Sequence, residues 1–88
     1  MVNKLDMKQK EEVEKIVIDL ISKKTGFDIL DIGTEETLSQ LGCDSLDAVE
    51  VLMGIENELD IQIMDELFDF TTPIGEIVKR VTEFYFNN

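Results

Sequence analysis

One serine in this sequence stands where its hydroxyl could carry a covalently attached group. Ser45 follows Asp44 at the start of a segment with helical periodicity. Asp44 can cap the free backbone N–H groups of such a helix start. Ser45 then falls in the first turn, where those donors and the positive end of the helix dipole favour an anion. A phosphate ester on Ser45 would be stabilised there, although ordinary capping without any modification also explains these two residues.

The chain lacks the residues that would attach a group to Ser45 unaided. It contains no His and a single Cys, so Ser-His-Asp and Cys-His activation of a nucleophile are excluded. A Gly-rich phosphate loop, a Cys/His ligand cluster and EF-hand spacing are also missing from the sequence. We therefore predict that the protein is not an enzyme and has neither catalytic residues nor a metal site. Attachment of a group to Ser45 would therefore need another protein, which would supply the base that deprotonates the hydroxyl and the metal ion.

The charge is strongly acidic and unevenly distributed. Twenty Asp and Glu against eight Lys and Arg leave a net charge of −12, and residues 28–70 hold thirteen acids without one base. This distribution argues against nucleic acid and anionic membrane as partners and favours basic protein surfaces. The single Cys excludes an internal disulfide, and no signal peptide or membrane-spanning run is recognisable. We expect a cytoplasmic monomer.

The length of the chain predicts a single domain over 1–88, and the apolar spacing in its first half predicts that this domain is helical. Apolar residues three and four positions apart indicate a first helix over about 5–24, which Gly26 ends as a C-cap. Residues 27–43 show no clean period. A structureless loop of this length would be unusual, so we interpret it as ordered, with its apolar residues reaching the core and room for one short helical turn.

The second half of the chain predicts three more helices. One runs from residue 44 or 45 to Leu59, a short one lies near 65–68, and the last begins with Thr72 as its cap and Pro73 at its first helical position. The predicted fold is thus all-α, a small four-helix bundle. It has three main helices, one short helix, and a long ordered loop after the first helix.

The second helix carries apolar residues on two faces. One stripe has the spacing that faces a core and comprises Ala48, Val51, Leu52, Ile55 and Leu59. A second set, Leu46, Val49 and Met53, is also helically spaced and is edged by the acids Asp47, Glu50 and Glu56. Either all eight apolar residues pack inside the bundle, or the second set is a docking surface for a partner with apolar pockets and basic rims. The run of acids without bases favours docking.

The residues around Ser45 resemble a known family. The stretch LSQLGCDSLDAVE, residues 38–50, is similar to the signature of acyl carrier proteins, in which a Leu-Gly pair precedes Asp-Ser-Leu and an acidic amphipathic helix. The similarity continues through 55–63 and the Thr71-Thr72 step. The resemblance implies that Ser45 is esterified with 4′-phosphopantetheine from coenzyme A by a magnesium-using phosphopantetheinyl transferase. The thiol of this arm would carry acyl groups as thioesters to acyl-transferring, condensing and reducing enzymes.

The resemblance also implies roles for other residues. By position, the contacts with partner enzymes would be Asp44, Leu46, Asp47, Val49, Glu50, Met53 and Glu56. Asp44 would in addition contact the transferase. Acyl chains of this family can lie between the helices, and the candidates for lining such a cleft are Ile55, Leu59, Ile63 and Phe68, for which plain core packing is the alternative.

Several positions depart from the family pattern. Met64 replaces a proline, Cys43 a common alanine, and Phe68 and Phe70 are bulkier than expected. Gly54 interrupts the second helix. These departures suggest a specialised carrier. We expect an acyl carrier of fatty-acid or related lipid or polyketide biosynthesis. The alternatives are a carrier of an aminoacyl, D-alanyl or peptidyl cargo, and an unmodified acidic helical adaptor.

Overall fold

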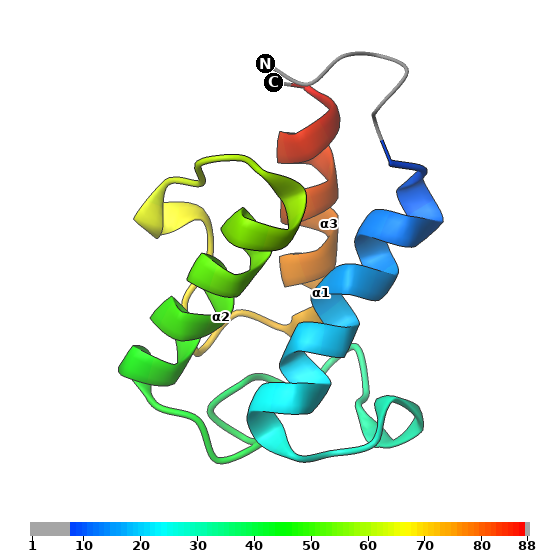
Figure 1. Cartoon of the computed structure of the whole chain (residues 1–88). Coiled ribbons are helices and arrows are strands. Elements are labelled where there is room, and N and C mark those ends of the chain that lie inside the picture. Colours follow the sequence, from blue (N-terminus) through cyan, green and yellow to red (C-terminus); the bar gives the residue numbers. More distant parts are fainter. Residues whose placement is uncertain (1–7, 88) are drawn as a thin grey trace.

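The computed structural model describes residues 8–87, and within this range three α-helices form the framework (Figure 1). They are α1 (Lys10–Thr25), α2 (Ser45–Leu59) and α3 (Ile74–Phe86). Two 3₁₀ turns, η2 (Ile29–Asp31) and η3 (Asp65–Leu67), lie in the connections. Apart from an isolated bridge between Thr37 and Pro73, the described residues contain no β structure. The predicted all-α class is confirmed.

The predicted short fourth helix is present only as a 3₁₀ turn. The segment near 65–68 forms only the three-residue turn η3. Met64 before it and Phe68 after it both have extended backbone, with ψ of 138° and 164°, so the helical hydrogen bonds cannot continue in either direction. Met64 has a φ of −67°, the value that a proline ring would impose. Met64 therefore adopts a φ that a proline at this position would also have.

α1 begins later than predicted among the described residues, at Lys10, and positions 5–7 of the expected helix lie outside them. Val13, Val17 and Ile21 are fully buried along one stripe. Gly26 ends the helix with a φ of 80°, and its N–H donates to Ser22 O at 2.9 Å. Only glycine adopts this left-handed conformation without steric cost, so the predicted C-cap is confirmed.

The loop between α1 and α2 is held in place by backbone hydrogen bonds to the start of α3. Ile74 N–H donates to Glu36 O and Gly75 N–H donates to Thr34 O, both at 2.8 Å. The prediction that its apolar residues reach the core holds for one part of the loop only. Those that are buried or half-buried are Leu38, Leu41 and Ile32, whereas Phe27 and Ile29 are exposed. Leu30 of η2 is exposed as well, at 92%.

The start of α3 also differs from the prediction. Pro73, not Thr72, is the N-cap residue, because its ψ of 140° is extended and the helix begins at Ile74. The Thr72 hydroxyl accepts a hydrogen bond from the Asp69 N–H at 3.0 Å and so closes the turn before the helix. α3 carries an apolar stripe, with Ile74, Ile77, Val81 and Tyr85 buried and Val78 and Phe84 half-buried.

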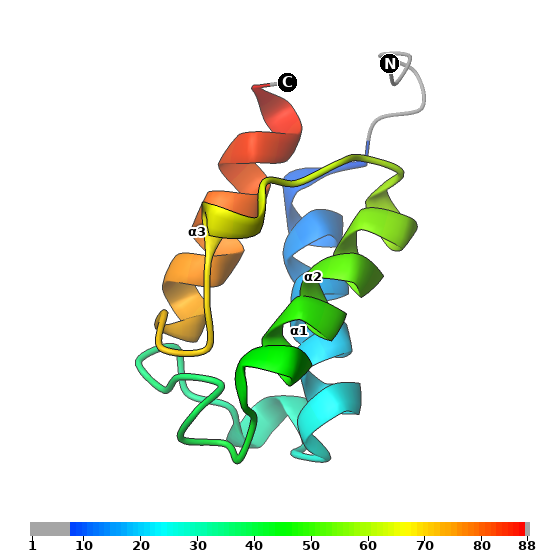
Figure 2. The ribbon, with the colours of Figure 1, turned by 90° about the vertical axis from the view of Figure 1, so that its left-hand side faces the viewer.

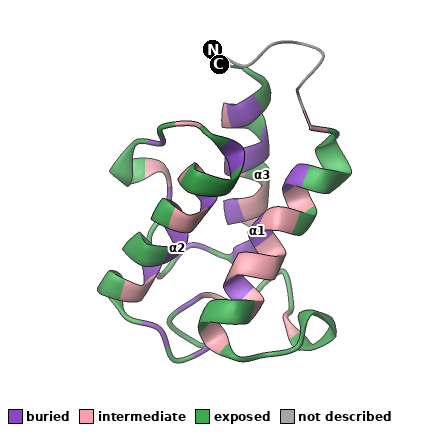
Figure 3. Cartoon of the chain, viewed as in Figure 1, coloured by how far each residue is buried: buried purple, intermediate pink, exposed green. Residues whose placement is uncertain are grey.

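The three helices enclose one core. α1 packs against both α2 and α3, while η3 packs against α3 (Figures 1 and 2). The largest fully buried side chains come from all three helices and the loop, and include Ile21, Leu38, Ile55, Ile74 and Ile77. Buried and exposed bands alternate along α2, so this helix contributes one side to the core and presents the other to solvent (Figure 3). None of the helices within residues 8–87 is long and apolar enough to cross a membrane.

Candidate functional site

Ser45 is the first residue of α2, and its side chain is exposed. The chain before it is firmly anchored. Gly42 takes a φ of 92°, which turns the backbone, and Cys43 is buried with its N–H donating to Leu38 O at 2.9 Å. The fold therefore fixes the backbone on which Ser45 lies but leaves its hydroxyl accessible to another protein. This is the geometry that covalent modification by an external enzyme requires.

A reciprocal capping box surrounds Ser45. Asp44 Oδ1 accepts from the Asp47 N–H at 3.0 Å, and Asp47 Oδ2 accepts from the Asp44 N–H at 3.0 Å. Side-chain acceptors thereby satisfy two of the backbone donors at the helix start. Asp44 is thus confirmed as the cap of this helix. The first-turn position of Ser45 next to unpaired donors and the positive dipole end suits an attached phosphate group.

The tertiary structure brings a lysine close to this helix start. Lys24, in the last turn of α1, places Nζ 3.3 Å from Asp47 Oδ1 and also contacts Glu50 Oε1. Hydrogen bonds to Glu50 and then Asp47 raise the pKa of Lys24 above its usual value. The pKa of Asp47 is lowered, first by the hydrogen bond from the Asp44 backbone and then by Lys24. The ion pairs therefore favour the protonated form of Lys24, which is not the form that acts as a base.

The Cys43 thiol lies two residues before Ser45, but it is not activated. It is free and buried. Burial is the main cause that raises its pKa, and the negative charge of Asp47 adds to the effect. Because the thiolate is the nucleophilic form of cysteine, this side chain remains an unreactive thiol at neutral pH. Its position fits a small core residue beneath the turn.

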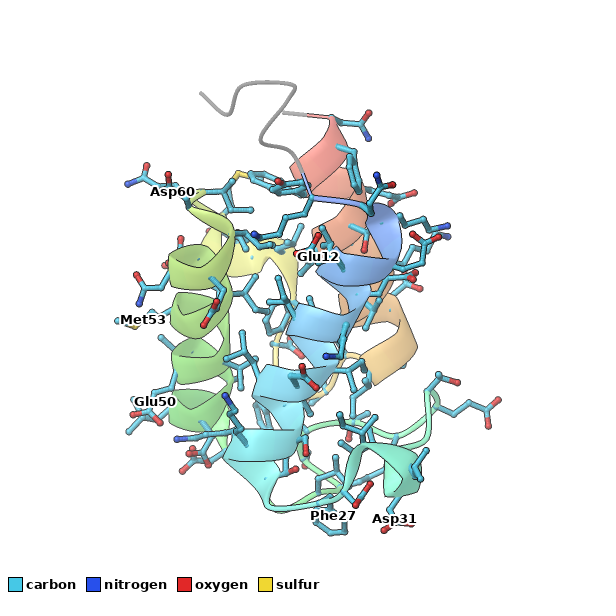
Figure 4. The ribbon with its side chains drawn as sticks, turned by 45° about the vertical axis from the view of Figure 1, so that its right-hand side comes forward. Glu12, Phe27, Asp31, Glu50, Met53 and Asp60 are labelled. Carbon is cyan, nitrogen blue, oxygen red and sulfur yellow. The ribbon has the colours of Figure 1, made fainter. Side chains whose placement is uncertain are left out.

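The second apolar set on α2 faces solvent. Leu46 is 64% exposed, Val49 49% and Met53 54%, whereas the first stripe (Ala48, Val51, Leu52, Ile55 and Leu59) is buried. The interpretation in which all eight residues pack inside is therefore wrong. Figure 4 shows Met53 and Glu50 projecting from the outer side of α2. We call Leu46, Val49 and Met53 the outer face of α2.

The acids predicted to edge the outer face are all engaged within the protein. Asp44 and Asp47 form the capping box, and Glu50 pairs with Lys24. Glu56 is half-buried, and its Oε2 accepts from the Ile63 N–H at 2.8 Å. Glu56 thus has a structural role, which is to hold the chain as it leaves α2. Unlike the Asp44 cap, the pairing of Glu50 with Lys24 and the hydrogen bond from Ile63 to Glu56 were not predicted from the sequence.

A cavity of about 160 Å³ opens beside Ser45, between α2 and residues 65–70. Its wall on α2 is made by Ser45, Ala48, Val49 and Leu52, and the opposite wall by Asp65, Phe68, Asp69 and Phe70. Of the four predicted cleft residues, Phe68 lines this cavity. The other three, Ile55, Leu59 and Ile63, are buried in the core and are not among its lining residues. Ala48 and Leu52 lie three and seven positions after Ser45, a helical spacing that would have indicated their place beside it.

Within the described part of the chain, no group of three or more His, Cys, Asp or Glu side chains is arranged to hold a metal ion. Asp69, at the edge of the cavity, is engaged by its own turn. Its Oδ1 accepts from the Thr71 N–H at 2.8 Å as well as from the Thr71 hydroxyl. The hydrogen bond from the Thr71 hydroxyl is the main reason that the pKa of Asp69 is lowered.

Comparison with known proteins identifies the class to which this fold and site belong. The family model described as "Phosphopantetheine attachment site" matches residues 15–81, which include all of α2. An acyl carrier protein of Clostridium acetobutylicum is 36% identical over 66 residues, which cover 74% of this chain and 86% of that protein. No solved structure matches the chain.

The chain therefore belongs to the acyl carrier protein family of phosphopantetheine-binding domains. Its cofactor is 4′-phosphopantetheine, which members of this family carry covalently. The residues of this structure fit such a group, because an exposed hydroxyl at a helix N-terminus adjoins a largely apolar cavity.

Proposed function

We propose that residues 1–88 form a single-domain acyl carrier protein that bears 4′-phosphopantetheine on Ser45. The observation that carries this proposal is the position of Ser45, which is exposed at the first residue of α2 and lies within the matched family region. When attached, the arm supplies a terminal thiol that forms thioesters with acyl groups. The cargo would belong to fatty-acid or related lipid or polyketide biosynthesis.

The protein itself takes a passive part in attachment. Lys24, which contacts acids of this helix start, has its pKa raised by hydrogen bonds to Glu50 and Asp47. The base that deprotonates Ser45 and the magnesium ion are therefore assigned to a phosphopantetheinyl transferase. The capping box fixes the backbone of the first turn of α2, from which the exposed Ser45 side chain extends. The protein acts as a carrier and not as an enzyme.

The outer face of α2 would dock the partner enzymes. It combines three exposed apolar side chains with neighbouring carboxylates, which complement a partner with apolar pockets and a basic rim. It also begins at Leu46, directly after Ser45, so a docked partner would have its active site close to the arm. Because a carrier must leave each partner, we expect docking to be individually weak and sensitive to salt.

The cavity beside Ser45 would shelter part of the cargo. Its volume of about 160 Å³ resembles that of an apolar cavity of about 150 Å³ that accommodates benzene. Ala48, Val49 and Leu52 face Phe68 and Phe70 across it, so its walls are mainly apolar. A short apolar acyl segment therefore fits the cavity as it stands. Ile55, Leu59 and Ile63 form packed core, so a longer chain would have to displace core side chains.

The proposal is tested by incubating the protein with coenzyme A, magnesium and a broad-specificity phosphopantetheinyl transferase, followed by intact-mass measurement. We expect one phosphopantetheine on the wild type and on Ser39→Ala, a matched change at another exposed serine, and none on Ser45→Ala. An arm that persists on Ser45→Ala, or a wild type that stays unmodified, would refute the assignment. Mass spectrometry of the protein from its native cell would then distinguish an acyl cargo from an aminoacyl or peptidyl one.

A further inference from the structure

The ion pairs of Lys24 connect α1 to the docking helix. Lys24 Nζ lies 3.3 Å from Asp47 Oδ1 and also contacts Glu50 Oε1, and both acids border the outer face of α2. We propose that Lys24 competes with the basic groups of a partner for the carboxylates of Asp47 and Glu50. This competition determines how strongly partners dock and how strongly docking depends on salt. This inference rests on the proposed function, since it requires that partners dock on α2.

The arrangement differs from a chance surface contact because several groups hold Lys24 in place. The Lys24 and Asp47 side chains are each only 31% exposed, and Glu50 is 49% exposed. A hollow of about 250 Å³ between α1 and α2 is lined by Leu20, Lys23, Lys24, Glu50 and Val51, so the Lys24 chain runs along apolar surface to reach the acids. The raised pKa of Lys24 and the lowered pKa of Asp47 agree with this pairing.

Lys24 differs from the other groups that engage the acids of α2. The Asp44 and Ile63 N–H groups donate hydrogen bonds to Asp47 and Glu56 but leave the carboxylate charge in place. Lys24 instead brings a positive charge, so that it, Asp47 and Glu50 together carry −1 where the two acids alone would carry −2. A partner's Arg or Lys gains full attraction to these carboxylates only after Lys24 has been displaced.

The closest alternative is that Lys24 only fastens α1 to α2. Ion pairs that keep contact with solvent, as these do at 31–49% side-chain exposure, contribute little to stability, and the buried contacts between these helices do not involve the Lys24 charge. We therefore expect Lys24→Gln to fold normally, with an unfolding midpoint close to that of the wild type. A purely structural role would change this midpoint without changing the recognition of a partner.

The test compares Lys24→Gln with Lys23→Gln. Both substitutions change the net charge from −12 to −13 in the same helix turn, but only Lys24 pairs with Asp47 and Glu50. The probe is the broad-specificity phosphopantetheinyl transferase, with each apo variant as its substrate, assayed between about 0.02 and 0.2 M NaCl. We expect Lys24→Gln to lower KM about two- to fivefold relative to Lys23→Gln, with unchanged kcat and a steeper rise of KM with salt.

A double-mutant cycle tests whether Lys24 changes KM through its pairing with Glu50. With Lys24 present, Glu50→Gln should raise KM only slightly, because Lys24 already offsets part of the carboxylate charge, whereas in the Lys24→Gln background the same change should raise KM several-fold. Equal KM values for Lys24→Gln and Lys23→Gln, or an equal effect of Glu50→Gln in both backgrounds, would overturn the competitor role while leaving the carrier function intact. A wild type that receives no arm would overturn both.

Discussion

Asp44 and Asp47 exchange two hydrogen bonds of 3.0 Å, each from the backbone N–H of one residue to the carboxylate of the other. Ser45 lies within the ring that these bonds close. The same Asp47 carboxylate also faces Lys24 of α1, at 3.3 Å. One acidic side chain thus couples the start of α2, the neighbouring helix α1 and the backbone that carries Ser45.

The first prediction concerns this cap. Asp44→Ala should lower the free energy of unfolding by about 0.5–2 kcal/mol, because the Asp47 N–H loses its acceptor. Asp44→Asn should retain most of the stability, since an amide oxygen caps equally well. Urea unfolding followed by circular dichroism measures both variants. Equal losses in the two variants would mean that the charge of Asp44, and not its hydrogen bond, stabilises the helix start.

The two faces of α2 should respond differently to truncation. Ile55 is fully buried, so Ile55→Ala should cost about 2–5 kcal/mol through the cavity it leaves. Met53 is 54% exposed, and Met53→Ala should change stability by less than about 0.5 kcal/mol. If the outer face docks partners, Met53→Ala should nevertheless raise the KM of the transferase. A large loss of stability in Met53→Ala would place this residue in the core.

Two glycines offer a matched pair of substitutions to alanine. A Cβ on Gly75 would lie 3.1 Å from Thr34 Cβ and 3.2 Å from Thr34 O, where the backbone hydrogen bond leaves no room for adjustment. We expect Gly75→Ala to destabilise the protein by about 1–3 kcal/mol.

A Cβ on Gly54 would meet only the flexible end of Leu20, at 3.4 Å, which is an ordinary contact. Gly54→Ala should therefore be neutral or stabilising by up to about 1 kcal/mol, because alanine favours the helix. Thermal unfolding of both variants tests the pair. If Gly54→Ala proves as harmful as Gly75→Ala, the packing of α1 on α2 is tighter than the structure indicates.

The turn before α3 should make stability depend on pH. The Thr71 hydroxyl is the main cause of the lowered pKa of Asp69, so Thr71→Val should raise this pKa towards its usual value. A lowered folded-state pKa stabilises the protein above the unfolded value of about 4, and this contribution disappears as the pH falls through the folded-state pKa.

The stability difference between wild type and Thr71→Val should therefore be constant at neutral pH and shrink in acid. An NMR titration of the Asp69 carboxyl carbon gives the pKa directly, and urea unfolding at several pH values gives the stability. A difference that grows towards acid pH would contradict this sign.

The helices and their buried stripes could be predicted from the sequence because both depend on local spacing. The apolar pattern of α2 specifies two faces, and Asp44 and Gly26 terminate helices through contacts within four residues. The start of α3 was predicted less accurately, because two neighbouring residues both have the character of a helix start. Thr72 has the character of an N-cap, but its hydroxyl closes the preceding turn with Asp69, and Pro73 takes the cap position instead.

The sequence by itself determined that the protein is small, acidic, helical and similar to acyl carrier proteins around Ser45. It left open whether the second apolar set of α2 is buried as well, because both sets have the same period and only the packing of α1 and the loop shows that Leu46, Val49 and Met53 meet solvent. The tertiary structure also decided the partners of the acids. Lys24 lies 23 and 26 positions before Asp47 and Glu50. A local sequence pattern cannot predict this pairing, because it forms only when α1 packs on α2.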